Sequence, residues 1–128
     1  AGTMGSGIAQ VVASSGREVV LIDVSEAALE RGVKGIESSL GRLVKKETIS
    51  EEESKAISSR ISKTTGFGDL KDVDLIIEAV FEDMTVKKEI YKKLDEAVEP
   101  DVVLATNTSS LPIVEIAVGT KRADKVVG

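Results

Sequence analysis

Three short apolar runs, separated by segments of helical periodicity, limit the folds open to this chain more than any other feature. They are Val19 to Ile22, "DLIIEAV" at 74–80 and "DVVLAT" at 101–106. An unbroken apolar run of this length is typical of a parallel strand that is buried on both faces. Strands that alternate with helices predict an α/β fold: an open, mostly parallel, doubly wound sheet with helices on both faces.

The segment 25–60 is longer than a simple crossover between two parallel strands requires. Ser25 is a suitable N-cap for a helix that extends to about residue 46, and Ser50 with Glu53 has the spacing of a capping box for a second helix. A short strand is expected at Ile61 to Thr64. A helical hairpin is therefore predicted within the α/β fold.

The remaining elements follow from turn and breaker residues. Gly16 is expected to end a small apolar helix that follows the N-terminal glycines, and Pro100 to end a helix that begins near residue 84. Pro112 is typical of the first turn of a short helix. A last strand is expected to begin in "DKVVG" at 124–128.

The first ten residues, "AGTMGSGIAQ", contain two of the three glycines of a G-x-G-x-x-G dinucleotide fingerprint, Gly2 and Gly5. We expect the first glycine and the first strand to precede Ala1. Such a turn lets the backbone approach a pyrophosphate, which the N-terminus of the following helix then binds. An ordinary tight turn is the alternative.

Asp23 favours the dinucleotide interpretation. It lies 21 residues after Gly2, at the end of the strand that follows, where a carboxylate can accept hydrogen bonds from a ribose. It also disfavours a 2′-phosphate, and neither Val24 nor Ser25 offers a cation to bind one. The prediction is NAD rather than NADP, with a turn-forming aspartate as the alternative.

Composition excludes several function classes. A chain of 128 residues is enough for one domain, and its net charge of −5 argues against nucleic acid or an anionic membrane as the main partner. No apolar run reaches the roughly 18 residues of a membrane span, and no signal peptide is expected. The chain has no Cys and no His, so no metal site is predicted. Its general base is either absent or outside these residues.

The chain resembles the nucleotide-binding half of the L-3-hydroxyacyl-CoA dehydrogenases, including the hydroxybutyryl-CoA enzymes. The resemblance covers essentially the whole chain and rests on "AGTMGSGIAQ", "VVLIDVSEAAL", "IIEAVFEDMTVKKEIYKKLDE" and "LATNTSSLPI". It implies a Rossmann-type NAD-binding domain over residues 1–128, truncated at both ends, that lacks its first strand and carries the helical hairpin 25–60.

The resemblance also implies roles for individual residues. NAD would be bound at Gly2, Thr3, Met4, Gly5, Asp23, Ala79, Glu82 and Lys87, of which Glu82 and Lys87 match positions on the nicotinamide side. Ser109 matches the serine that positions the substrate's 3-oxygen, with Asn107 beside it. The hairpin matches a helical tail that contacts coenzyme A, with Ser39 and Lys46 at the contacting positions.

The same resemblance places further parts outside these residues. The catalytic His would follow Gly128, with its partner Glu and an all-helical dimerising domain further on. It implies an NAD-dependent oxidoreductase that converts an L-3-hydroxyacyl-CoA to the 3-oxoacyl-CoA in fatty-acid β-oxidation or butanoate metabolism. A cytoplasmic homodimer is expected, and the 128 residues alone are expected to be inactive.

Other interpretations of the same residues remain open. Ser109 and Ser110 could cap the following helix, and Lys45 and Lys46 could be solvated charges. Glu82 and Asp83 could be first-turn helix acids. The alternative functions are a non-catalytic NAD-binding regulatory module and another Rossmann dehydrogenase, of the β-hydroxyacid or sugar-nucleotide type.

Overall fold

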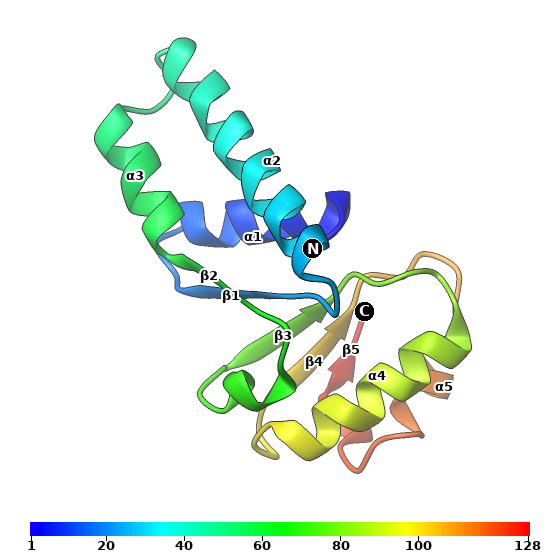
Figure 1. The fold of residues 1–128 in the computed structure, drawn as a ribbon. Coiled ribbons are helices and arrows are strands. Elements are labelled where there is room, and N and C mark those ends of the chain that lie inside the picture. The colour runs from blue at the N-terminus through cyan, green and yellow to red at the C-terminus, as the bar shows by residue number, and fades with distance from the viewer. The chain divides into compact units, whose positions relative to one another are not determined.

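A computed structural model describes all 128 residues, and the chain divides into two compact units. Unit 1 comprises Ala1–Gly66 and unit 2 comprises Phe67–Gly128. Both consist of parallel strands connected by helices (Figure 1). None of the helices combines the length and the apolar character that crossing a membrane requires.

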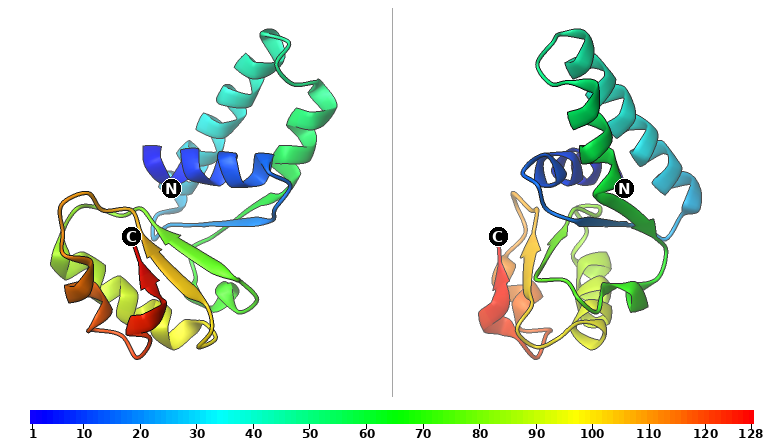
Figure 2. Two further views of the ribbon diagram at one scale, coloured as in Figure 1. Left: turned by 180° about the vertical axis from the view of Figure 1, so that it is seen from behind. Right: turned by 90° about the vertical axis from the view of Figure 1, so that its left-hand side faces the viewer.

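Unit 1 contains a two-stranded parallel sheet and three helices. Its elements in chain order are α1 (Thr3–Ser14), β1 (Val19–Ile22), α2 (Glu26–Lys45), α3 (Glu51–Ser59) and β2 (Ile61–Thr64). Val19 lies opposite Ile61 and Ile22 opposite Thr64. Helices α2 and α3 lie side by side as an antiparallel hairpin (Figures 1 and 2). The predicted helical hairpin is therefore present.

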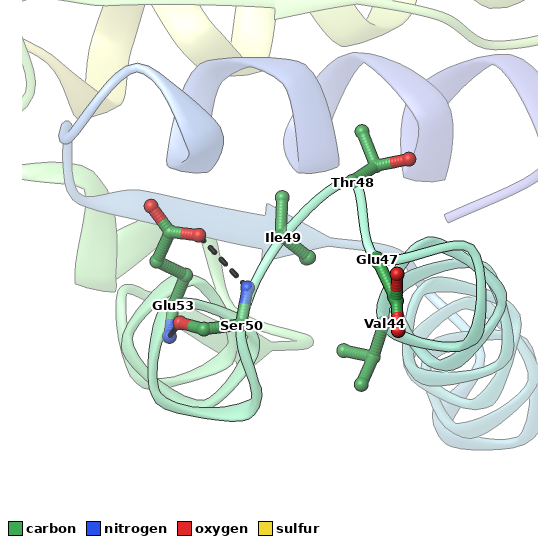
Figure 3. A pocket seen from close by; sticks show the side chains of 6 residues that line it. All are labelled: Val44, Glu47, Thr48, Ile49, Ser50 and Glu53. Carbon is green, nitrogen blue, oxygen red and sulfur yellow. Dashed lines mark hydrogen bonds between the residues drawn. The ribbon is translucent and has the colours of Figure 1, made fainter.

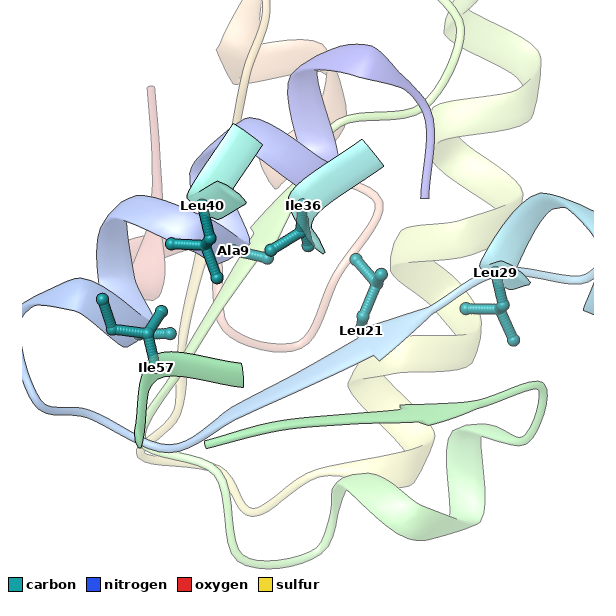
Figure 4. Packing of buried hydrophobic residues seen from close by; sticks show 7 residues of the cluster. Ala9, Leu21, Leu29, Ile36, Leu40 and Ile57 are labelled. Atoms are coloured by element: carbon teal, nitrogen blue, oxygen red, sulfur yellow. The ribbon is translucent and has the colours of Figure 1, made fainter. Parts of the chain in front are cut away.

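The core of unit 1 joins the hairpin to α1 and β1. The buried apolar side chains there are Ala9, Ala13, Leu21, Leu29, Ile36, Leu40 and Ile57. The residues contributed by α2 recur at helical spacing, so that one face of a long helix is buried while the other stays polar. Figure 4 shows the side chains of α1, α2, α3 and β1 directed toward one another.

Local capping signals of unit 1 act as the sequence predicts. The Ser25 side chain accepts a hydrogen bond from the backbone N–H of Ala28, and Ser50 and Glu53 form a complete capping box at the start of α3. Gly16 follows the C-cap of α1 with a φ of 89°, a left-handed conformation that glycine adopts at little cost.

Unit 2 contains a three-stranded parallel sheet in the order β3-β4-β5. Its elements are a 3-10 turn η1 (Phe67–Leu70), β3 (Leu75–Glu78), α4 (Met84–Ala97), β4 (Val103–Thr106), α5 (Ile113–Ala117), a 3-10 turn η2 (Ala123–Lys125) and β5 (Val126–Val127). Leu75 lies opposite Val103, and Glu78 opposite Thr106.

The strands form two sheets rather than the single sheet that we expected. In the doubly wound order 3-2-1-4-5-6, the first strand pairs with both the second and the fourth. The observed orders, β1-β2 and β3-β4-β5, are the two parts of that order without its first strand. Strands β1 and β3, which would flank the first strand in the doubly wound order, each pair with one neighbour only.

A buried arginine completes the C-terminal end of α4. Arg122 donates to the carbonyl oxygens of Asp95 and Val98, each at 3.0 Å, and to that of Glu99. Its Nε also lies 2.7 Å from Oδ1 of Asp95, with both side chains 7% exposed. The guanidinium thus satisfies carbonyl groups that a helix C-terminus leaves without partners.

Candidate functional site

The polar residues singled out from the sequence lie mostly at or just after the carboxyl ends of strands. Asp23 follows β1, Glu82 follows β3 by four residues, and Asn107 follows β4 directly. Ligands of open α/β sheets bind beyond these ends. Each of the two units therefore carries candidate site residues of its own.

The glycine turn of unit 1 leads straight into α1. Gly2 is the N-cap, in an extended conformation, and no side chain caps the helix. The first bond within the helix runs from the Ser6 N–H to the Gly2 carbonyl oxygen at 2.9 Å, so the N–H groups of Thr3, Met4 and Gly5 have no acceptor within it. A Cβ added to Gly2 would meet nothing within 4 Å. These features suit a bound anion.

Asp23 is fixed at the end of β1 by a hydrogen bond to its carboxylate. Its Oδ1 accepts from the backbone N–H of Ser25 at 3.0 Å. Asp23 is therefore a hydrogen-bond acceptor at the position expected of a residue that binds a ribose.

Gly32 allows α2 to pack closely against the start of the chain. A Cβ at this position would lie 2.9 Å from the carbonyl oxygen of Ala1 and 2.8 Å from Oγ of Ser6. Ser6 also donates to that carbonyl at 3.0 Å. The absence of a side chain at Gly32 thus accommodates Ala1 and the Ser6 hydroxyl.

In unit 2, a buried carboxylate links the ends of two strands to α4. Glu78, the last residue of β3, is 4% exposed. Its oxygens accept from Lys87 Nζ at 2.7 and 2.9 Å, from Oγ1 of Thr106 at 2.6 Å and from the backbone N–H of Val80 at 2.8 Å. Its carbonyl oxygen accepts from the N–H of Asn107 at 2.8 Å. Sequence patterns did not single out Glu78.

Glu82 lies near the ion pair of Glu78 and Lys87 and is hydrogen-bonded to the loop after β4. Its Oε1 accepts from the hydroxyls of Thr108 and Ser110, and its Oε2 lies 3.7 Å from Lys87 Nζ. The Thr108 hydrogen bond is the main reason that the pKa of Glu82 is below its ordinary value, and the Lys87 charge acts in the same direction. The Glu82 side chain is 39% exposed.

Lys87 differs from Glu82 because its side chain has no exposed surface. Two of its three N–H bonds are used by Glu78, and the nearest other carboxylate is that of Glu82. Tyr91, one turn further along α4, is also buried, and its hydroxyl has no hydrogen-bond partner. Burial, and then the negative charge of Glu78, raise the pKa of Tyr91, so the phenol stays neutral.

The loop at 107–111 exposes one hydroxyl that is not committed to the protein. The hydroxyls of Thr108 and Ser110 donate to Glu82, and the N–H of Leu111 donates to Oγ1 of Thr108 at 3.1 Å. Ser109, between them, is exposed and its hydroxyl makes no hydrogen bond within the chain. Asn107 is exposed at the start of the loop.

The alternative that Ser109 or Ser110 caps the following helix is wrong. Helix α5 begins at Ile113 with Pro112 as its N-cap, and no side chain accepts a hydrogen bond from its first turn. Glu82 is not a first-turn acid either, because α4 begins at Met84 and the residue that caps it is Asp83.

The hairpin of unit 1 carries the two residues expected to contact coenzyme A. Ser39 is half-buried in α2, and Lys46 is exposed as the C-cap of that helix. The turn that follows is a Schellman motif: Glu47 adopts a φ of 57°, and the N–H of Thr48 donates to the carbonyl of Leu43 at 3.0 Å.

An open hollow of about 450 Å³ lies at the tip of the hairpin (Figure 3). The residues that line it are Val44, Glu47, Thr48, Ile49, Ser50 and Glu53. Its lining residues include Glu47, which follows Lys46 in sequence, and Glu53, so that two carboxylates line the hollow.

The structure brings Glu82, Lys87 and the loop containing Ser109 together in unit 2, and places Asp23 beside the glycine turn in unit 1. Ala79, half-buried after Glu78, contributes to the start of the loop that leads to Glu82. No group of three or more His, Cys, Asp or Glu side chains is arranged to bind a metal ion.

Comparison with known proteins gives a consistent result. All of residues 1–128 match the family model described as "3-hydroxyacyl-CoA dehydrogenase, NAD binding domain". Among curated proteins, the chain is 49% identical over 127 residues to 3-hydroxybutyryl-CoA dehydrogenase of Clostridioides difficile, covering 99% of this chain and 45% of that protein. It is 39% identical over 133 residues to the mitochondrial hydroxyacyl-coenzyme A dehydrogenase of Rattus norvegicus, covering 99% and 42%.

Solved structures show the same fold. The chain is similar to (S)-3-hydroxybutyryl-CoA dehydrogenase PaaH1 from Ralstonia eutropha, with a TM-score of 0.95, 44% identity, and coverage of 98% of this chain and 44% of that one. The chain thus spans less than half the length of each of these relatives.

Proposed function

The chain belongs to the family of 3-hydroxyacyl-CoA dehydrogenase NAD-binding domains, and we propose on this basis that it forms part of an NAD-dependent L-3-hydroxyacyl-CoA dehydrogenase. The complete enzyme would remove the C3 hydrogen of the substrate as a hydride, which NAD accepts, and the hydroxyl hydrogen as a proton. The products would be the 3-oxoacyl-CoA, NADH and a proton. Such a reaction belongs to fatty-acid β-oxidation or butanoate metabolism.

The residues of unit 1 fit the adenosine and pyrophosphate parts of the cofactor. Three free N–H groups at the start of α1, those of Thr3, Met4 and Gly5, would receive a pyrophosphate. Gly2 leaves open space for its approach. The Asp23 carboxylate, just after β1, would accept the ribose hydroxyls, which favours NAD over NADP because it would repel a 2′-phosphate.

In unit 2, Ala79, Glu82 and Lys87 are proposed for the nicotinamide part. Ser109 is proposed to hydrogen-bond the 3-oxygen of the substrate, with Asn107 beside it. The free Ser109 hydroxyl carries this proposal, since both neighbouring hydroxyls are bonded to Glu82 and hold the loop in place. A hydrogen bond that shortens as charge develops on the oxygen lowers the barrier of the reaction.

The proton acceptor is proposed from the resemblance to the family. The chain has no His, and the pKa of Glu82 is lowered, which makes it a weaker base. By that resemblance we propose a His in a segment after Gly128 as the general base, and expect the 128 residues alone to be inactive.

The other partners are inferred from the family. Ser39 and Lys46 on the hairpin are proposed to contact coenzyme A. A homodimer through a helical domain outside these residues is part of the same proposal. So is a cytoplasmic location, although one relative, in rat, is mitochondrial.

Cofactor choice tests the proposal without depending on turnover. NADH and NADPH are titrated by fluorescence into the complete protein, as wild type, Asp23→Ala and Glu18→Ala. Glu18 is an exposed acid at the opposite end of β1 and serves as the matched control. Wild type should prefer NADH, and Asp23→Ala should lose about 1.5–3 kcal/mol of NADH binding through its charge-assisted hydrogen bonds. Equal wild-type affinity for the two cofactors would refute the assignment.

A further inference from the structure

The loop after β4 has hydrogen bonds on both sides of Ser109 that fix its backbone. Before Ser109, the N–H of Asn107 donates to the carbonyl oxygen of Glu78 at 2.8 Å. After it, the N–H of Leu111 donates to Oγ1 of Thr108 at 3.1 Å. Ser109 itself is exposed, and its hydroxyl makes no hydrogen bond within the chain. The side chain proposed to meet the substrate is therefore free, while the backbone around it is held.

One carboxylate oxygen bridges the two residues that flank Ser109. Oε1 of Glu82 accepts from the hydroxyl of Thr108 and, at 3.2 Å, from that of Ser110. The Thr108 oxygen also accepts from the N–H of Leu111, so that this hydroxyl is donor and acceptor at once. Side-chain bonds of this kind to nearby backbone groups fix local turns. Thr108 thus makes both the bond that closes the turn around Ser109 and a bond that anchors it to Glu82.

The acceptor of this bridge is a charged group. The hydrogen bond from Thr108 is the main reason that the pKa of Glu82 is below its ordinary value, and the bond from Ser110 and the charge of Lys87 act in the same direction. An ionised carboxylate can only accept hydrogen bonds. At neutral pH both hydroxyls therefore donate to Glu82, and a hydrogen bond to a charged partner is stronger than one between neutral groups.

We propose that Thr108 is a positioning residue that orients the Ser109 hydroxyl toward the 3-oxygen of the substrate, with Ser110 as a second, weaker anchor. The proposal rests on the function proposed for Ser109. A hydroxyl that is held in its reactive orientation before the substrate arrives loses less conformational freedom in the transition state. Without the bridge to Glu82, Ser109 would keep its hydroxyl but lose the backbone support that directs it.

Thr108→Val tests this role because it removes the hydroxyl and keeps the shape of the side chain. Thr108→Ser keeps the hydroxyl and is the rescuing variant. Thr120→Val is the matched control, because the Thr120 hydroxyl donates to the carbonyl oxygen of Ala117 at 2.8 Å and accepts from the N–H of Arg122 at 3.3 Å. Both threonines are half-buried in unit 2. The two valine variants therefore remove similar bonds, but only Thr108 is bonded to Glu82.

Oxidation of L-3-hydroxybutyryl-CoA by the complete protein at saturating NAD gives the first readout. Thr108→Val should lower kcat about ten-fold, because a small misplacement of a positioned group is costly in the transition state. Thr108→Ser and Thr120→Val should stay close to wild type. An unaltered kcat for Thr108→Val would overturn the inference. So would an equal loss in Thr120→Val, since it would show a general effect of removing such a hydroxyl.

A double-mutant cycle with Ser109→Ala shows whether Thr108 acts through Ser109. If it does, Thr108→Val in the Ser109→Ala background should cause no further loss of kcat, because the hydroxyl to be oriented is already absent. Losses that multiply would overturn the inference, since they would mean that Thr108 affects the reaction by another route, such as through Glu82.

A readout in the free protein tests the bridge itself. The pKa of Glu82 is followed by carbon-13 NMR of its labelled side-chain carboxyl. Thr108→Val should raise that pKa, because the charged form loses the hydrogen bond that lowers it most. Thr108→Ser and Thr120→Val should leave it at the wild-type value. An unshifted Glu82 pKa in Thr108→Val would overturn the inference.

Ser109→Ala alone distinguishes failure of this inference from failure of the proposed function. If Ser109→Ala lowers kcat and Thr108→Val does not, Ser109 keeps its proposed role and only the positioning by Thr108 is refuted. If Ser109→Ala leaves kcat unaltered, the role proposed for Ser109 is refuted and the inference falls with it. Losses of kcat in both single variants, with no further loss in the double variant, are the result we expect.

Discussion

Gly32 faces the carbonyl oxygen of Ala1 so closely that a Cβ atom at position 32 would lie 2.9 Å from it. Gly35 and Gly41 lie in the same helix, and a Cβ at either would meet nothing within 4 Å. The three glycines therefore have different reasons to be present. Only Gly32 is required by the packing of α2 against Ala1 and Ser6.

Gly32→Ala should lower the free energy of unfolding by about 1–3 kcal/mol, because backbone atoms have to move to admit the methyl group. Gly35→Ala and Gly41→Ala should raise it by about 0.5–1 kcal/mol through better helix propensity. Urea unfolding followed by circular dichroism measures all three. Stabilisation by Gly32→Ala as large as that of its neighbours would show that the close packing is absent.

Acid stability should depend on Asp95. Burial favours its neutral form, but bonds from the Lys121 N–H and from Arg122 outweigh this and hold the pKa of Asp95 below its ordinary value. A carboxyl with a lowered folded-state pKa stabilises the fold fully above its unfolded-state pKa and loses that contribution as the pH falls through the folded-state pKa. We expect the free energy of unfolding to decline below about pH 4.

Asp95→Asn should lower the free energy of unfolding at pH 7. It should also make the decline of that free energy below about pH 4 shallower. Urea unfolding of both proteins at intervals from pH 7 to pH 2 provides the measurement. The slope should not vanish, because Glu82 also has a lowered pKa. Parallel curves for wild type and Asp95→Asn would contradict the assigned role of Asp95.

Lys46 should affect the acyl-CoA substrate and not the cofactor. Lys46→Ala in the complete protein should raise KM for 3-hydroxybutyryl-CoA several-fold and leave KM for NAD unchanged, since an exposed cation–phosphate contact contributes about 1 kcal/mol or less. Lys45→Ala, at the adjacent exposed position that ends α2, is the matched control. The same KM for 3-hydroxybutyryl-CoA in wild type and both variants would indicate that Lys46 is only a solvated charge.

Sequence patterns predicted the elements well where a single local signal sufficed. Val19–Ile22 and Ile61–Thr64 are strands, and Ser50 with Glu53 forms the expected capping box. These features depend on residues close in sequence. The division of the strands into two sheets, β1-β2 and β3-β4-β5, was not predicted, because strand pairing joins residues that are far apart in sequence.

The candidate site was predicted less completely because it depends on distant contacts. Helical periodicity alone indicates a face of α4 formed by Val86, Ile90, Leu94 and Val98, yet Val86 is 37% exposed and the fully buried residues include Lys87 and Tyr91. A buried lysine has no apolar signature. The available signal was Glu78, an acidic residue that ends the apolar run "LII" of a buried strand and needs a cationic partner nearby.

Ser109 is proposed to carry the substrate-positioning hydroxyl of a 3-hydroxyacyl-CoA dehydrogenase. Steady-state oxidation of L-3-hydroxybutyryl-CoA by the complete protein, as wild type and as Ser109→Ala, tests it most directly, with NADH affinity measured alongside. Wild type should turn over, and Ser109→Ala should lower kcat ten-fold or more at unchanged NADH affinity, since a hydrogen bond to a partly charged oxygen contributes about 1.5–3 kcal/mol. An unaltered kcat for Ser109→Ala would contradict this account.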